Sequence, residues 1–319
     1  MWKNRLFAGA VFATVLAATA VLAATAVAKP SRQQATPVKL GFITKFPVDF
    51  FFTLENAAKK WDAATPGAKV IFGRGKSGTD DAGVIAAIQN MVAQGVKGIA
   101  ITPTSAAVVP ALNKARKAGV KIVLMDNDIP SWKGKTAVVA TDNLKGGVLA
   151  GKFLATKLKA GDTLGVLEGV PGVPALDARV SGMLAGLGAL KSKIKVVSKL
   201  ETDCDQTKGA TAAQTMLTAN QNLTAIYSAC GPPALGAIQS IKNAGIKPAD
   251  ILLVGFDASP DEVKAIKAGT ETASVAQFPA KIGSLGIATL YRAVRGKAVP
   301  KNVDTGTALV TKANAAKFG

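Results

Sequence analysis

Residues 79–102 read TDDAGVIAAIQNMVAQGVKGIAIT and contain the unit from which the fold is built. We predict a helix over Thr79–Gln94, because Thr79 can cap its start and Gly95 can end it. The apolar residues of this segment recur at helical spacing and share one face, namely Val84, Ile85, Ile88, Met91 and Val92. A short β-branched run, Ile99–Thr102, follows and indicates a buried strand. The stretch therefore predicts a helix that packs against a sheet.

The same alternation of short β-branched runs and longer amphipathic segments continues along the chain. A first series of predicted strands comprises Lys39–Thr44, Val70–Phe72, Ile99–Thr102, Lys121–Met125 and Ala137–Ala140. A second series comprises Thr163–Glu168, Ile194–Lys199, Ala225–Ser228, Ile251–Val254 and Ala273–Ala276. Helical patterns lie between the strands, including Asp205–Asn220 and Pro279–Gly296. This alternation predicts an α/β fold with helices on both faces of parallel sheets. The two series predict two doubly wound lobes rather than one large sheet.

The N-terminal segment has the pattern of a secretory signal peptide. Lys3 and Arg5 precede a long apolar run, and small residues at Ala26 and Ala28 form a cleavage site. The run is also long enough for a membrane anchor, but the small-residue site favours cleavage near Ala28. We therefore expect residues 1–28 to be removed and the protein to be exported to the periplasm. About 290 residues remain, which favours two domains.

Composition excludes several classes of function. The formal net charge is +19, but the positive residues are scattered singly, so we expect no nucleic-acid partner. The chain has no histidine and two cysteines, which excludes Ser-His-Asp triads, His-ligated metals and a structural zinc centre. The segment Gly73–Thr79 lacks the first glycine of a phosphate-binding loop. We therefore expect no metal, no cofactor and no common hydrolase mechanism.

Candidate ligand-binding residues follow the predicted strands, because ligands of open α/β sheets bind beyond the carboxyl ends of the strands. Asp126 and Asn127 follow one apolar strand, and Asp257 follows another. Carboxylates there can accept hydrogen bonds from ligand hydroxyls, although Asp and Asn are also common in turns and Asp257 could cap a helix near Pro260. Three aromatic residues, Phe50–Phe52, start a helix and either stack on a sugar or belong to the core.

Several motifs together resemble the ribose-binding-protein family of type I periplasmic binding proteins. They are VGFDASPD at 254–261, AQFPAKIG at 276–283, TDNLKGG at 141–147, ITPT at 101–104 and the Phe50–Phe51 pair. The resemblance covers Val38 to Thr311 in order and with similar spacing. It implies two lobes joined by three hinge strands, a sugar held in the cleft, and delivery to an ABC permease without catalysis.

The resemblance also assigns roles to residues. It places Phe50 and Phe51 at stacking aromatics, Asp126 and Asp257 at hydroxyl-binding carboxylates, and Gln277 beside the hinge. The chain departs from the family at three places. Asn127 and Asp177 stand where the family has arginines, whereas Arg179 matches a family arginine. Val48-Asp49 stands where an Asn usually precedes the aromatics. The ligand-binding set is thus Asp49, Phe50, Phe51, Asp126, Asn127, Asp177, Arg179, Cys230, Asp257 and Gln277. A different pentose or an open-chain polyol is favoured over ribose.

The cysteines, Cys204 and Cys230, fall at family positions that line the cleft, and Cys230 stands where the family commonly has a ligand-binding Asn. In an oxidising periplasm they would form a disulfide, and the alternative is two separate buried thiols.

The sequence predicts a monomer whose lobes close on a ligand. We expect an N-terminal lobe of 38–140 plus 278–303 and a C-terminal lobe of 141–277 plus 304–319. A sugar-responsive transcription regulator would need a helix-turn-helix before the first strand, where the signal peptide stands. A sugar-acting enzyme using Asp126 and Asp257 lacks a recognisable catalytic motif. The same fold could also serve as the ligand sensor for a chemoreceptor.

Overall fold

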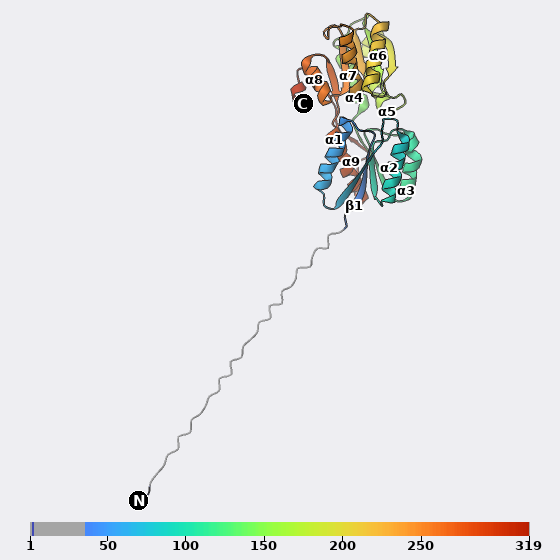
Figure 1. Cartoon of the computed structure of the whole chain (residues 1–319), viewed down its shortest axis with the longest axis vertical. Coiled ribbons are helices and arrows are strands. Elements are labelled where there is room, and N and C mark those ends of the chain that lie inside the picture. The colour runs from blue at the N-terminus through green and yellow to red at the C-terminus, as the bar shows by residue number, and fades with distance from the viewer. Residues whose placement is uncertain (1, 3–35, 319) are drawn as a thin grey trace. The chain divides into compact units, whose positions relative to one another are not determined.

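Two six-stranded sheets organise the chain in a computed structural model that describes residue 2 and residues 36–318. The predicted signal peptide and its cleavage at Ala28 lie outside the described residues. The first sheet has the order β11 (Asn302–Asp304), β5 (Ala137–Ala140), β4 (Lys121–Met125), β3 (Gly98–Ile101), β1 (Val38–Thr44) and β2 (Ala68–Arg74). The second has the order β12 (Ala308–Thr311), β10 (Ala273–Ala276), β9 (Leu252–Asp257), β8 (Ala225–Ser228), β6 (Thr163–Glu168) and β7 (Lys195–Glu201). The predicted pair of α/β lobes is confirmed (Figure 1).

Helices cover both faces of each sheet. Those of the first lobe are α1 (Asp49–Ala63), α2 (Asp81–Ala93), α3 (Val109–Lys117) and α9 (Pro279–Val294). Those of the second are α4 (Asn143–Ala155), α5 (Pro174–Gly186), α6 (Gln206–Ala219), α7 (Gly231–Asn243) and α8 (Pro260–Ala268). Short 3-10 turns occupy Ala106–Val108, Gly188–Ser192 and Ala315–Lys317. No helix of the described part is both long and apolar enough to cross a bilayer.

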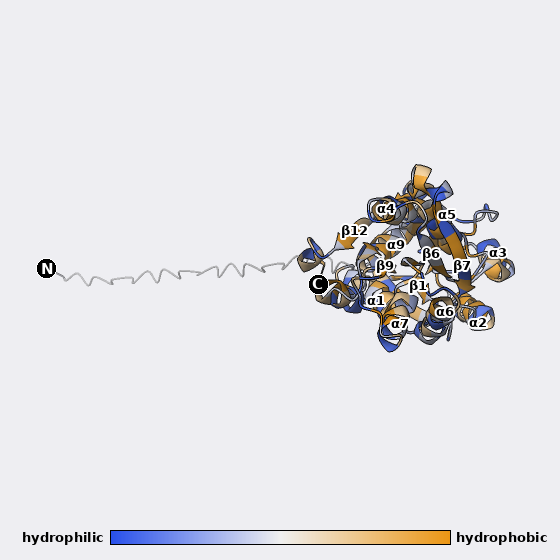
Figure 2. Cartoon of the chain, turned by 90° about the horizontal axis from the view of Figure 1, so that it is seen from above, coloured by the Kyte–Doolittle hydropathy of each residue, from blue (hydrophilic) through white to orange (hydrophobic). Residues whose placement is uncertain are grey.

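Strands buried on both faces explain the near-continuous apolar runs of the sequence. In β4, Ile122 and Leu124 pack with α2 and α3, whereas Val123 and Met125 pack with α1 and α9. The second sheet divides its strands in the same way between the α4–α5 pair and the α6–α7 pair. Around the strands, the helices carry both hydrophobic and hydrophilic stretches (Figure 2). Each sheet is therefore the centre of its own core.

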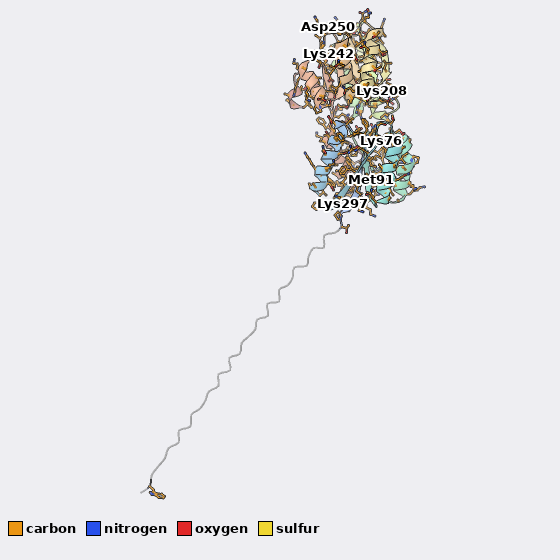
Figure 3. The ribbon with its side chains drawn as sticks, in the orientation of Figure 1. Lys76, Met91, Lys208, Lys242, Asp250 and Lys297 are labelled. Atoms are coloured by element: carbon orange, nitrogen blue, oxygen red, sulfur yellow. A yellow bond between two sulfur atoms is a disulfide. The ribbon has the colours of Figure 1, made fainter. Side chains whose placement is uncertain are left out.

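The predicted helix at 79–94 forms as α2, two residues shorter at its start. Its capping residue is Asp80 rather than the predicted Thr79, because the Asp80 carboxylate accepts hydrogen bonds from the N–H groups of Gly83 (2.9 Å) and Lys76 (2.8 Å). Met91 of α2 (Figure 3) lies over β1, where its sulfur would be 2.4 Å from a Cβ added at Gly41. The glycine thus permits close packing of helix on strand.

The chain passes between the two sheets three times, after β5, after β10 and after β11. Two strands that the sequence did not predict, β11 and β12, flank the third passage. β11 adds to the first sheet in parallel beside β5, and β12 adds to the second antiparallel to β10. Each lobe is therefore completed by a segment from the end of the chain.

Candidate ligand-binding site

Two predicted carboxylates lie at strand ends in different sheets. Asp126 directly follows β4, and Asp257 is the last residue of β9. Both have a left-handed backbone, with φ of +62° and +102°, which is unusual outside glycine and is often found at functional sites. The two carboxylates are close enough that the charge of Asp257 raises the pKa of Asp126, after the larger effect of burial. The structure thus places one carboxylate of each lobe within electrostatic range of the other.

Asp257 is held by three groups of its own lobe. Its Oδ2 accepts a hydrogen bond from the Gly231 N–H at 3.1 Å, and its Oδ1 accepts one from Gln277 Nε2 at 2.7 Å. Arg179 Nη1 lies 3.5 Å from Oδ1. Burial raises the pKa of Asp257, and Arg179 opposes that rise. Asp257 does not cap α8, because Ser259 and Glu262 form a capping box there.

Arg179 is buried and fixed from several sides. Its Nε donates to Asn143 Oδ1 at 2.8 Å, and its Nη1 donates to the Ala229 carbonyl at 2.9 Å. The guanidinium also lies 4.0 Å from the centroid of the Phe256 ring. These contacts orient the cation beside Asp257 and compensate for its removal from water.

Lys45 is a buried cation that the sequence analysis did not single out. It follows β1 directly, is 8% exposed, and its ammonium forms no hydrogen bond within the described chain. Burial lowers its pKa to about 8; the charges of Asp126 and Asp81 oppose that decrease, and Arg179 adds to it. The Asp126 carboxylate likewise accepts no hydrogen bond within the described chain. Lys45 could have been predicted as a site residue from the sequence, because it directly follows a strand.

The aromatic residues at the start of α1 divide between core and surface. Phe51 is 5% exposed and belongs to the core of the first lobe. For this residue the structure therefore favours the core over stacking on a sugar, the two alternatives that the sequence left open. Phe50 is half-buried and meets Phe51 edge-on, with ring centroids 5.2 Å apart. Phe52 is exposed and lies beside Arg74. Asp49 is exposed, and its carboxylate forms no bond to any described residue.

The two residues that replace family arginines differ in burial and in hydrogen bonding. Asn127 is 5% exposed and its amide makes a long hydrogen bond, 3.4 Å, to the Pro103 carbonyl. Asp177 is exposed in the first turn of α5, where its Oδ1 accepts a hydrogen bond from the Gly172 N–H at 3.3 Å. Asn127 thus remains beside Asp126, whereas Asp177 stabilises the loop before α5.

Cys204 and Cys230 form the disulfide that the sequence indicated, with Cα atoms 5.5 Å apart. Cys230 is the residue before α7, and the next residue, Gly231, donates the hydrogen bond to Asp257. Cys204 Sγ would lie 3.0 Å from a Cβ added at Gly169. The bridge therefore links the loop after β7 to the residue before α7, next to the Gly231 N–H that binds Asp257.

Three buried oxygen atoms that accept no hydrogen bond from any described residue lie where the chain passes between the sheets. They are Thr141 Oγ1 after β5, Gln277 Oε1 after β10 and Thr305 Oγ1 after β11. Sequence reasoning placed only Gln277 in the site. Buried polar atoms usually have a partner, so these oxygens are available to water or to a ligand.

A family model described as periplasmic binding protein domain matches residues 40–298. The ribose import binding protein RbsB of Bacillus subtilis is 34% identical over 264 residues, which are 82% of this chain and 83% of that protein.

Two solved structures have a similar fold. A carbohydrate transporter solute-binding protein of Agrobacterium radiobacter, in complex with D-arabinose, superposes with a TM-score of 0.82 at 28% identity, covering 89% of this chain and 97% of that one. An ABC transporter solute-binding protein of Agrobacterium vitis, with bound D-fucose, gives a TM-score of 0.82 at 28% identity, covering 88% and 97%.

Proposed function

Because the chain belongs to the periplasmic binding protein domain family, we propose that it captures a monosaccharide or sugar alcohol between its lobes and delivers it to the permease of an ABC importer. Its relatives are solute-binding proteins of sugar importers and not enzymes, and this chain is one of them. The relative from Bacillus subtilis is a ribose import protein, and the similar structures hold D-arabinose and D-fucose. For this chain we favour a different pentose or a polyol over ribose.

The observation that carries the proposal is the placement of two buried carboxylates, Asp126 and Asp257, at the strand ends of two different sheets, within electrostatic range of each other. Each lobe also brings a cation, Lys45 in the first and Arg179 in the second. A ligand with several hydroxyl groups would satisfy both halves only when the lobes are close together. Binding would therefore stabilise a closed form, which the permease could recognise.

In this proposal the free groups of the site contact the ligand. The Asp126 carboxylate accepts hydrogen bonds from hydroxyl groups, the Lys45 ammonium donates to a ligand oxygen, and Gln277 Oε1 accepts another hydrogen bond. Phe50 stacks on C–H groups of the ligand. Asp257, with Arg179 behind it, supplies the acceptor of the second lobe. An amide at Asn127 in place of a guanidinium favours ligands that offer hydroxyl donors.

The proposed lobe boundaries are 38–140 plus 278–303 and 141–277 plus 304–319. The strand order supports them, because β11 belongs to the first sheet and β12 to the second. We further propose that the leader is cleaved after Ala28 and that the mature monomer is periplasmic.

A calorimetric screen tests the proposal. Ribose, other pentoses, hexoses and polyols are titrated into the mature protein, and a pentose other than ribose, or a polyol, is expected to bind more tightly than ribose. Asp126→Asn should weaken that ligand at least tenfold, because a charged acceptor becomes a neutral amide. The matched control is Asp250→Asn, an exposed carboxylate at the far end of the second lobe (Figure 3). Absence of binding across the panel would overturn the function, and tight ribose binding would overturn the ligand preference.

A further inference from the structure

We propose that the ligand site continues past Asn127 into a second subsite, which takes an additional neutral sugar unit joined to the first. The inference rests on the proposed function and extends it from a single monosaccharide to a glycoside or short oligosaccharide. It starts from a groove of about 310 Å³ that residues of both lobes line. That volume lies at the small end of the range for ligand clefts in proteins.

Four loops form the groove, all of them at the carboxyl ends of strands. Three belong to the first lobe and one to the second, and their lining residues fall within 78–81, 103–106, 127–131 and 170–174. The groove therefore lies between the same two strand-end edges as Asp126 and Asp257. A ligand bound there would contact both lobes, as the proposed closure mechanism requires.

Two links join the groove to the candidate site. Asn127 lines the groove and is the neighbour of Asp126, and its Oδ1 accepts no hydrogen bond within the described chain. Asp81 also lines the groove, and its charge acts on the Lys45 ammonium. In this proposal a ligand held by Asp126 and Lys45 extends along Asn127 toward Asp81.

The lining favours a neutral, hydroxylated ligand with apolar C–H faces. Rigid rings of four prolines line the groove, at positions 103, 130, 171 and 174. The Asp81 carboxylate already accepts hydrogen bonds from the hydroxyls of Thr104 and Ser105. Asp128 pairs with Lys135. Among the described residues no cation lines the groove, so an anionic group would find no partner there. A sugar ring, by contrast, could place C–H groups on the prolines and hydroxyls on the polar edge.

Matched pairs of ligands test the inference. Calorimetry compares each monosaccharide or polyol with its extended form: xylose with xylobiose, galactose with lactose and melibiose, glucose with maltose and cellobiose, and glucitol with maltitol. We expect at least one extended form to bind at least tenfold more tightly than its single unit. If single units bind and no extended form gains affinity, the second subsite is overturned while the proposed function stands. If neither kind binds, the proposed function itself fails.

Substitutions that fill the groove test whether the higher affinity of an extended ligand comes from contacts in the groove. Ala106 is exposed and lines the groove, whereas Ala107 is exposed on the same turn and does not line it. Ala106→Trp should abolish the extra affinity for the extended ligand and leave the affinity for the single unit within twofold of wild type. Ala107→Trp should leave both affinities unchanged. Pro171→Trp fills the groove from the other lobe and should act like Ala106→Trp. Retention of the gain in both groove variants, with thermal unfolding showing that they fold, would overturn the inference.

Discussion

The side-chain amide of Gln277 donates a hydrogen bond to Asp257 Oδ1 at 2.7 Å, which joins a site carboxylate to the segment where the chain leaves the second sheet. The Oε1 atom of the same side chain is buried and accepts no hydrogen bond within the described part of the chain. Gln277 is thus positioned to orient Asp257 with one atom and to offer an acceptor with the other. Because it stands at a passage between the lobes, it couples the site to the segment that closure must bend.

Replacing Gln277 with Leu should weaken ligand binding tenfold or more. The change removes the donor that orients Asp257 and leaves that buried oxygen without its hydrogen bond, which typically costs about 1–3 kcal/mol. Titration calorimetry with the tightest ligand of the screen measures the loss. Gln239→Leu, at an exposed position on α7, is the matched control and should bind as the wild type does. Equal affinity of Gln277→Leu and wild type would contradict a role in the site.

Binding should also depend on the protonation of Lys45. Its pKa lies at about 8 in the folded protein, below the ordinary value of 10.5, so the ammonium loses its proton as the pH rises through about 8. A neutral amine is a weaker donor, and the association constant should therefore fall between pH 7 and pH 9.5. Lys45→Met should bind about ten- to a hundredfold more weakly at pH 7, as expected for a charged hydrogen bond of about 1.5–3 kcal/mol.

The pH profile separates Lys45 from other titrating groups. In Lys45→Met the association constant should be nearly flat from pH 7 to pH 9.5. Lys297→Met, an exposed lysine at the far end of the first lobe (Figure 3), should keep the wild-type profile. An unchanged slope in Lys45→Met would show that another group causes the pH dependence.

The sequence predicted the strands best where burial on both faces demanded apolar runs. Lys121–Met125 and Ala137–Ala140 were predicted with their observed bounds. β11 and β12 were not predicted, because they are mostly exposed or half-buried and depend on pairing with the remote strands β5 and β10 rather than on a buried apolar run.

Some residues of the candidate site could likewise be predicted from the sequence, and others could not. Asp126 and Asp257 could be predicted since they end apolar strands, but the burial of Lys45 depends on charges and atoms from distant segments. The burial of Phe51 could have been predicted from helical spacing. Phe51 shares a face of α1 with Leu54 and Ala58, which are fully buried.

Opening the Cys204–Cys230 disulfide should reduce both stability and affinity. The bridge spans 26 residues, and its loss in the chain-entropy model lowers the free energy of unfolding by about 3.5 kcal/mol. Affinity should fall as well, because Cys230 fixes the Gly231 N–H that binds Asp257. Denaturant unfolding and calorimetry with and without reductant measure the two effects. A Cys204→Ser, Cys230→Ser double variant should match the reduced protein and no longer respond to reductant. Two reactive thiols in the unfolded, unreduced wild type would contradict the bridge.

Stability should decrease with rising pH because of Glu262, which is fully buried at the start of α8. Burial raises its pKa to about 8 from an ordinary 4.5, and the nearby charge of Asp257 adds to that rise. The folded state therefore binds this proton more tightly than the unfolded state, so the free energy of unfolding falls between pH 4.5 and 8, by at most about 1.4 kcal/mol per pH unit. Glu262→Gln can still accept the hydrogen bond from the Ser259 N–H, and its advantage over wild type in denaturant unfolding should widen from pH 5 to pH 8. Asp261→Asn, an exposed carboxylate on the same helix, should show no such widening. Parallel pH curves for wild type and Glu262→Gln would refute the assignment.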